Sequence, residues 1–315
     1  MIEASMESQL VSSGTLAASI TRTASTHTYD TIRWLVDPGL VDDAYRAYAY
    51  FRWVDDWLDQ QPRPRAERLA FVQRQQALID LCADNDPPSD LSPEERLLAD
   101  LIRRDTEINS GLHAYIRNMM AVMAFDADRR WRLISQRELN EYTYWLAVAV
   151  TEAMHYFIGH DCTAPHGEVR YMAVTAAHMT HMLRDALEDV KMGYYNIPSE
   201  VLAASDIEPW DVQSDAYRDW VKARVRKARA CFRLGKAYLA QVESLRCRVA
   251  GYAYTHRFEA VLDQIERADG VLQATYPEPK GSRPRVEMIG WALWMALSHR
   301  RHTHATPTRN SGVHI

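Results

Sequence analysis

Residues 48–59 read Tyr-Ala-Tyr-Phe-Arg-Trp-Val-Asp-Asp-Trp-Leu-Asp, from Tyr48 to Asp59. Asp55 and Asp59 are four residues apart, so on a helix they share one face, where two negative charges repel unless a cation lies between them. Apolar and aromatic side chains fill most other positions, which leaves little of such a helix suited to face solvent. An ordinary solvated acidic face, the usual interpretation of one such pair, is therefore weakened here, and a pair of carboxylates that holds a cation is the alternative.

Residues 178–189 contain a second pair, Asp185 and Asp189, with the same spacing. An arginine precedes each pair, at Arg52 and Arg184, and a planar guanidinium suits the oxygens of a diphosphate. Mg²⁺ prefers oxygen ligands and completes its coordination with waters and substrate phosphate. Two such pairs on separate helices predict a cage of facing carboxylates that binds Mg²⁺ and a diphosphate.

The sequence around these two stretches predicts helices nearly throughout. Only 12 of the 315 residues are glycine, apolar residues recur at intervals of three and four, and alternating β-branched runs are absent. We expect helices at residues 42–59, 65–82, 93–106, 112–125, 136–158, 168–192, 214–244, 250–268 and 283–299. The breaks between them are short, so we expect one all-α bundle domain over residues 25–300, with a flexible tail at 1–24 and a disordered tail at 301–315.

Composition argues against several classes of protein. The formal net charge is -5, which disfavours nucleic acid as a partner, because binding its phosphates needs a clustered positive surface. The cysteines form no Cys-x-x-Cys pair, so we expect no zinc framework, and we expect reduced thiols as in the cytoplasm. No stretch approaches the roughly 18 consecutive apolar residues of a membrane span, although a peripheral membrane contact and the oligomeric state stay open.

Both aspartate stretches are similar to motifs of one known family. YFRWVDDWLD at residues 50–59 resembles the first aspartate motif of squalene and phytoene synthases, and MLRDALEDVKMGYYNIP at residues 182–198 resembles the second. Thr26 and Thr28 fall where the family has a hydroxyl-rich segment that contacts diphosphate, and residues 142–151 resemble its mid-chain helix of tyrosine and small residues. The resemblance implies the all-helical isoprenoid synthase fold with a central cavity, Mg²⁺ as cofactor, and an allylic prenyl diphosphate as substrate.

The resemblance also implies a role for each candidate residue. Carboxylates hold Mg²⁺ against the diphosphate, whose departure leaves an allylic carbocation that an aromatic cavity shields from water. The metal ligands would be Asp55, Asp59, Asp185 and Asp189, with Asp56 assisting. The substrate contacts would be Thr26, Thr28, Arg52 and Arg184, and the cavity wall would include Tyr48, Tyr142 and Tyr144. Ordinary core packing is the alternative for each tyrosine, because it gives aromatic residues at the same spacing.

Two histidines depart from the family pattern. His178 and His181 stand seven and four residues before Asp185, where the family usually has glutamine and asparagine. Histidine is an uncommon ligand of Mg²⁺ but can accept a proton near neutral pH. We therefore consider the two histidines as candidates for a catalytic base, with packed or hydrogen-bonded histidines as the alternative.

Groups that would meet a second diphosphate are replaced as well. In residues 193–198, Tyr194 and Asn196 take the places of the arginine and tyrosine of the family's Gly-Arg-x-Tyr-x-Pro segment, and Thr275 stands where an arginine is expected. A second prenyl diphosphate, with about three negative charges, would be poorly compensated there. This favours prenyl transfer to a non-diphosphate acceptor, as in the phytoene-synthase-like prenyltransferases that alkylate carbazole-type aromatic natural products.

Other interpretations remain beside this one. The main alternative is head-to-head condensation of two prenyl diphosphates to a squalene- or phytoene-like product. A further alternative is cyclisation of a single prenyl diphosphate. Family relatives that serve as non-catalytic assembly factors of respiratory complexes tend to lose the aspartates. All four principal carboxylates are present here, which disfavours that non-enzymatic role.

Overall fold

The computed structural model describes residues 2–59, 63–276 and 290, with the backbone alone for residues 2–12. These residues are mostly helical and contain no β-strand, which confirms the predicted all-α class, and eight of the predicted helices are present with ends shifted by a few residues. The elements are α1 (Ile2–Ala24), α2 (Thr26–Leu35), η1 (Pro38–Leu40), α3 (Val41–Asp59), α4 (Arg65–Ala83), α5 (Pro93–Arg104), α6 (Gly111–Arg129), α7 (Gln136–Phe157), η2 (Glu168–Tyr171), α8 (Met172–Met192), α9 (Ser199–Ser205), α10 (Asp215–Leu239) and α11 (Leu245–Arg267).

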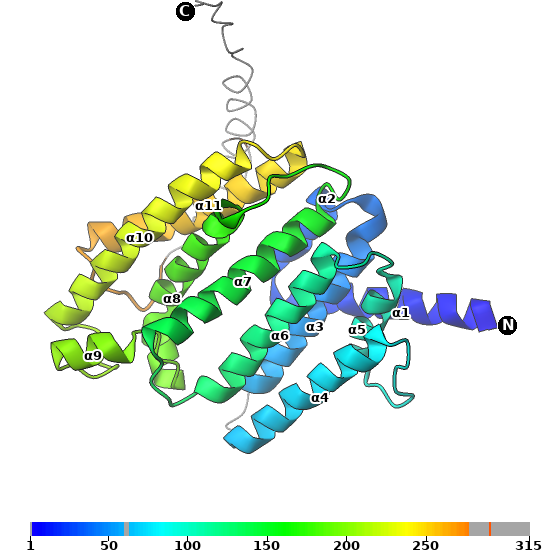
Figure 1. Cartoon of the computed structure of the whole chain (residues 1–315), viewed down its shortest axis with the longest axis horizontal. Coiled ribbons are helices and arrows are strands. Elements are labelled where there is room, and N and C mark those ends of the chain that lie inside the picture. Colours follow the sequence, from blue (N-terminus) through cyan, green and yellow to red (C-terminus); the bar gives the residue numbers. More distant parts are fainter. Residues whose placement is uncertain (1, 60–62, 277–289, 291–315) are drawn as a thin grey trace, which may run out of the picture.

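The helices pack in two groups that meet along α7 and α8 (Figure 1). The group from α1 to α7 shares a core that includes Tyr50, Leu97 and Leu139. α8 packs against α7 and also against α10 and α11, where Phe232 and Leu262 are fully buried. None of the described helices is long and apolar enough to cross a membrane.

Helix ends follow local sequence signals. α7 begins with a capping box, in which the Ser135 hydroxyl accepts from the Glu138 N–H and the Glu138 carboxylate accepts from the Ser135 N–H. α8 ends at Gly193, whose φ of 85° lies in the left-handed region that favours glycine. A Cβ atom there would lie 2.4 Å from the ring of Trp131, so the position also lacks space for a side chain. The turn at Gly193 brings the residues that follow it back beside the aspartates of α8.

The N-terminal segment corrects one expectation. The sequence predicts a flexible tail over residues 1–24, but the structure has α1 there, and Ala17 and Thr21 are fully buried where α1 packs against α3. Ala17 and Thr21 are small and lie one turn apart, so α1 can approach α3 closely. In the sequence, these two residues do not stand out from the other Ser, Thr and Ala residues of the segment. α2 and the short α9 are also helices that the periodicity does not predict. The helix expected at 283–299 and the tail expected at 301–315 lie outside the described residues.

Candidate active site

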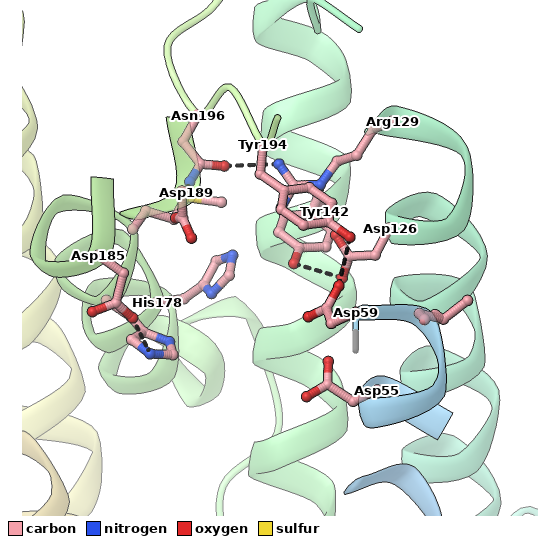
Figure 2. Close-up of a pocket in the computed structure, with 13 residues that line it drawn as sticks. Asp55, Asp59, Asp126, Arg129, Tyr142, His178, Asp185, Asp189, Tyr194 and Asn196 are labelled. Carbon is pink, nitrogen blue, oxygen red and sulfur yellow. Dashed lines mark hydrogen bonds and ion pairs between the residues drawn. The ribbon is translucent and has the colours of Figure 1, made fainter. Parts of the chain in front are cut away.

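A pocket of about 200 Å³ is lined by residues of α3, α6, α7 and α8. Figure 2 shows Asp55 and Asp59 on one side of this pocket and Asp185 and Asp189 on the other. The structure thus brings the four aspartates that the sequence singles out to one place, although they lie about 130 residues apart in the chain. Leu58 contributes apolar surface to the wall.

Two of these carboxyls have strongly raised pKa values. The pKa of Asp55 is raised to about 7 by burial and then by the negative charges of Asp59 and Asp126, even though part of the side chain is exposed. Burial and the charge of Asp185 raise the pKa of Asp189 to about 7. Because carboxylates in such positions repel one another at neutral pH, a bound cation would be favourable between them.

Asp185 differs from its neighbours because its charge is balanced by other residues of α8. Burial would raise its pKa, but hydrogen bonds from His181 and Arg184 outweigh burial and hold the pKa below its usual range. His181 Nε2 lies 2.8 Å from Asp185 Oδ2, and Arg184 donates from Nε and Nη2 over 2.7 and 2.9 Å. Asp185 is therefore ionised and already paired.

The donor set suits Mg²⁺ without forming a closed metal cage. Among the residues that the structure describes, no three His, Cys, Asp or Glu side chains are grouped closely enough to hold a metal ion. Mg²⁺ usually takes only one or two protein carboxylates and fills its octahedral shell with waters and substrate phosphate. Aspartate pairs that face each other across a pocket match that pattern.

The two predicted diphosphate-binding arginines lie beside their motifs, but neither lines the pocket. Arg52 donates to Asp56, and its Nη1 lies 3.5 Å from Asp55 Oδ2. Arg184 makes the paired contacts with Asp185. Both arginines neutralise carboxylates of their own motif, and their contact with diphosphate stays a prediction, as does assistance by Asp56.

The predicted wall tyrosines occupy three different environments. Tyr142 lines the pocket, and its hydroxyl donates to Asp126 Oδ2 over 3.0 Å. Tyr48 is partly buried against the core of the first helix group and does not line the pocket. Tyr144 is 57% exposed, and its ring packs edge-on against Tyr171. Residues two apart on a helix point to different faces, so Tyr144 cannot share the wall with Tyr142, which corrects that expectation.

The two predicted threonines belong to the start of α2 rather than to the pocket wall. The N–H and the hydroxyl of Thr28 both donate to the Ser25 hydroxyl, which caps the helix. Thr26 is exposed. A contact of either residue with diphosphate stays a prediction.

His178 and His181 both line the pocket, but only one is hydrogen-bonded. His181 pairs with Asp185. His178 is buried, and its ring meets that of Tyr142 edge-on at 5.0 Å. Neither of its ring nitrogens has a hydrogen-bond partner in the described part of the chain. Burial, followed by electrostatic interaction with His181, Arg129 and Arg224, lowers the pKa of His178 well below its usual range. His178 is therefore a neutral imidazole with unbonded nitrogens at the pocket.

Arg129 is a buried cation of the pocket that the sequence analysis missed. It donates to Asp126 over 2.6 Å and to Asn196 Oδ1 over 2.8 Å. Its guanidinium carbon lies 4.7 Å from the ring centre of Tyr142 and 4.9 Å from that of Tyr194, within range of cation–π attraction. The positive charge that the sequence lacks at position 194 is thus partly replaced from α6.

Tyr194 and Asn196, which replace the arginine and tyrosine of the family's Gly-Arg-x-Tyr-x-Pro segment, each bond to one aspartate motif. The Tyr194 hydroxyl donates to Asp59 over 2.7 Å, and Asn196 Nδ2 donates to Asp189 over 2.7 Å. Figure 2 shows both side chains beside Arg129. Hydrogen bonds thus connect Asp189 through Asn196 and Arg129 to Asp126, while Tyr194, which bonds to Asp59, meets Arg129 by its ring.

The comparison with known families decides the class of the protein. The family model described as squalene/phytoene synthase matches residues 22–287. The chain belongs to this family. Squalene/phytoene synthases are prenyltransferases that act on prenyl diphosphates and generally use Mg²⁺, so the chain is a prenyl-transferring enzyme, as the resemblance implies.

Solved structures show that this family member has the isoprenoid synthase fold. A dehydrosqualene synthase in complex with ligand is 16% identical with a TM-score of 0.72, over 92% of this chain and 99% of that chain. The squalene synthase HpnC from Alicyclobacillus acidocaldarius is 17% identical with a TM-score of 0.66, over 84% of this chain and 97% of that chain. TcSQS in complex with its ligand BPH1237 is 14% identical with a TM-score of 0.65, over 95% of this chain and 94% of that chain. No curated protein sequence matches the chain.

Proposed function

We propose that this enzyme transfers the prenyl group of one prenyl diphosphate to an acceptor without a diphosphate, an aromatic compound of the carbazole type. An asymmetry of charge in the pocket carries the proposal. All four motif carboxylates line the pocket, whereas Arg129 is the only arginine or lysine that lines it in the described part of the chain. Asp126 already pairs with Arg129. A second diphosphate, with about three negative charges, would be poorly compensated there.

The aspartate side of the pocket would bind the donor. Mg²⁺ held by Asp55 and Asp189 with their motif partners would neutralise the diphosphate as it leaves. Tyr142 lines the pocket, and an aromatic ring can stabilise a nearby cation. Leu58 and Met182 add apolar wall that keeps water from the carbocation.

His178 would complete the transfer to an aromatic acceptor. The bond between the prenyl carbon and the diphosphate oxygen breaks, and its electron pair leaves with the diphosphate. A π pair of the acceptor ring forms the new carbon–carbon bond. The substituted ring carbon then loses its proton to His178, and the electrons of that C–H bond restore the aromatic ring. The lowered pKa of His178 is no obstacle, because a protonated aromatic ring is a very strong acid and needs only an unbonded, neutral base.

Head-to-head condensation of two prenyl diphosphates is the second candidate. The family and the fold shared with a dehydrosqualene synthase and a squalene synthase favour it. Arg129 would have to serve the second diphosphate while it balances Asp126. The two candidates therefore differ in how many diphosphates the pocket accepts.

An unreactive donor analogue separates the two candidates. Isothermal titration with farnesyl thiodiphosphate and Mg²⁺ should give one bound molecule per chain. A second site of similar affinity would overturn the proposal in favour of head-to-head condensation. Asp55→Asn is the control, because loss of a metal ligand should weaken the one site and leave the fold intact.

A further inference from the structure

Arg224 of α10 is a buried arginine without an oxygen partner. It is 7% exposed, and its Nε has no hydrogen-bond partner. Nη2 lies 3.9 Å from Met182 Sδ, a weak acceptor, and the guanidinium carbon lies 5.7 Å from the ring centre of Trp220. Among the residues that the structure describes, no carboxylate forms an ion pair with Arg224. The positive charge of this side chain is therefore not balanced locally.

The other buried arginines in the described part of the chain all donate to oxygen. Arg46, Arg129 and Arg170 pair with Asp43, Asp126 and Glu152, and Arg68 and Arg248 donate to backbone carbonyls. Burial without such a partner disfavours the charged form and lowers the pKa of Arg224 to about 10, at which the group stays protonated at neutral pH. An unpaired buried guanidinium is a strong binding group for an anion.

Arg224 lies one side chain behind the wall of the active-site pocket. His178 and Met182 are four residues apart on α8, so they share one face, and both line the pocket. Met182 also contacts the guanidinium. Methionine has three rotatable bonds and adapts its shape to a neighbour, so a ligand could displace it. His178 and the Met182 side chain that contacts Arg224 therefore belong to the same part of the pocket wall, on α8.

We propose that Arg224 binds an acidic oxygen of the acceptor, a carboxylate or a phenolate, beside the part of the pocket wall that His178 and Met182 form. This inference rests on the proposed function, since it concerns the acceptor of that reaction. Asp185 and Asp189 lie three and seven residues beyond Met182, about 4.5 and 10 Å further along the helix, so the acidic oxygen would bind on the N-terminal side of both carboxylates. One guanidinium matches one carboxylate with two parallel hydrogen bonds but leaves most of a diphosphate's charge unbalanced.

The two forms of the acidic oxygen have different chemical consequences. A phenol that has released its proton to water binds as the phenolate, which has more electron density at the ring carbons ortho and para to oxygen, so it attacks the prenyl carbocation more readily. The ring proton then passes to His178, and the diphosphate leaves with its electron pair as before. A carboxylate would orient the ring at Arg224 without activating it in this way.

Binding of small aromatic probes tests the inference directly. We would titrate indole-2-carboxylate, its uncharged amide indole-2-carboxamide, and 4-hydroxyindole into the protein saturated with Mg²⁺ and farnesyl thiodiphosphate. Arg224→Gln removes the buried charge, and Lys227→Gln is the matched control, because Lys227 is an exposed cation of the same helix. Thermal melting of each variant reports whether Arg224 is needed for the fold.

The wild type should bind the carboxylate or the hydroxyindole at least 10-fold more tightly than the amide, and which of the two binds identifies the source of the acidic oxygen. Arg224→Gln should weaken that binding by about 10- to 100-fold, with little effect on the amide. Its melting temperature should be unchanged or higher, because an unpaired buried charge is removed. Lys227→Gln should behave as the wild type.

Three results would overturn the inference. The wild type could bind the amide as tightly as both acidic probes, Arg224→Gln could keep wild-type affinity, or Arg224→Gln could melt well below the wild type, which would make Arg224 a structural residue. In each case, prenylation of a neutral aromatic acceptor would leave the proposed function standing. If the wild type instead binds two thiodiphosphates and Arg224→Gln binds one, Arg224 serves a second diphosphate and both proposals fail.

Discussion

Two sets of polar side chains at the pocket differ in how they are paired. In the aspartate set, Asp59 accepts a hydrogen bond from Tyr194, and Asp189 accepts one from Asn196. In the other set, both nitrogens of His178 and Nε of Arg224 have no hydrogen-bond partner among the residues that the structure describes. In the proposed function, the aspartates would hold Mg²⁺ and the donor diphosphate. His178 and Arg224 would meet the second reactant, and there we expect this enzyme to differ from its relatives.

Substitutions of the motif aspartates should have the largest effect on catalysis. Asp55→Asn or Asp189→Asn should slow diphosphate release by about 100-fold or more, because a weakened Mg²⁺ site loses several kcal/mol of transition-state stabilisation. Release is measured with a coupled diphosphate assay, and circular dichroism checks the fold. Asp80→Asn is the control, since Asp80 is an exposed aspartate of α4 that does not line the pocket. Equal losses in Asp55→Asn and Asp80→Asn would contradict the assignment.

Arg129→Met should mainly affect stability. It leaves Asp126 as an unpaired buried charge, which should lower the free energy of unfolding by about 3–5 kcal/mol in urea denaturation. The double variant Asp126→Asn/Arg129→Met removes both charges and should recover much of that loss. It should remain poorly active, because Arg129 also holds Asn196, the partner of Asp189. A double variant as unstable as the single one would show that the ion pair is not the cause.

His178→Gln should separate the two halves of the reaction. Transfer to an aromatic acceptor should slow by about 100-fold, the usual scale for loss of a general base, while diphosphate release stays within severalfold of the wild type. The readout is the ratio of prenylated product to released diphosphate in one reaction. His181→Asn should lower both together, because His181 pairs with Asp185. An unchanged ratio in His178→Gln would rule out its role as the base.

The pKa values of Asp55 and Asp189 predict a pH dependence of metal stabilisation. Folding raises the pKa values of both carboxyls to about 7, from about 4 in the unfolded chain, which stabilises the metal-free protein while the carboxyls are protonated. This stabilisation is fully present below about pH 4 and is lost as pH rises through about 7. Mg²⁺ binds the ionised pair, so it should raise the melting temperature by roughly 5 °C at pH 8 and very little at pH 5. Scanning fluorimetry at both pH values checks this, and an equal shift at both would argue against these ligands.

Local spacing was enough to predict eight of the helices and the two aspartate pairs. Both signals repeat within one helical turn, so each aspartate pair can be placed on one helix face without knowledge of the fold. Residues two apart on a helix point to different faces, so Tyr144 could have been excluded from the pocket wall from the sequence alone, once Tyr142 is placed there. Hydrophobic periodicity also found the long helices of the bundle from α3 onward.

Long-range contacts explain what the sequence could not predict. Arg129 meets Asn196 across 67 residues, and nothing local distinguishes it from Arg130, whose Nε donates to a carbonyl near the surface. α1 packs through Ala17, a small residue that carries little hydrophobic signal. Similarly, only the packing of α10 on α8 reveals that Arg224 is buried without a carboxylate.

Product analysis tests the central claim most directly. The enzyme is incubated with Mg²⁺ and one prenyl diphosphate at a time, of increasing chain length, with and without an aromatic acceptor, and the products are identified by mass spectrometry. The account predicts a prenylated aromatic product only when the acceptor is present, with one diphosphate released per product. Efficient conversion of the donor alone to a head-to-head hydrocarbon with twice its carbon number would contradict it.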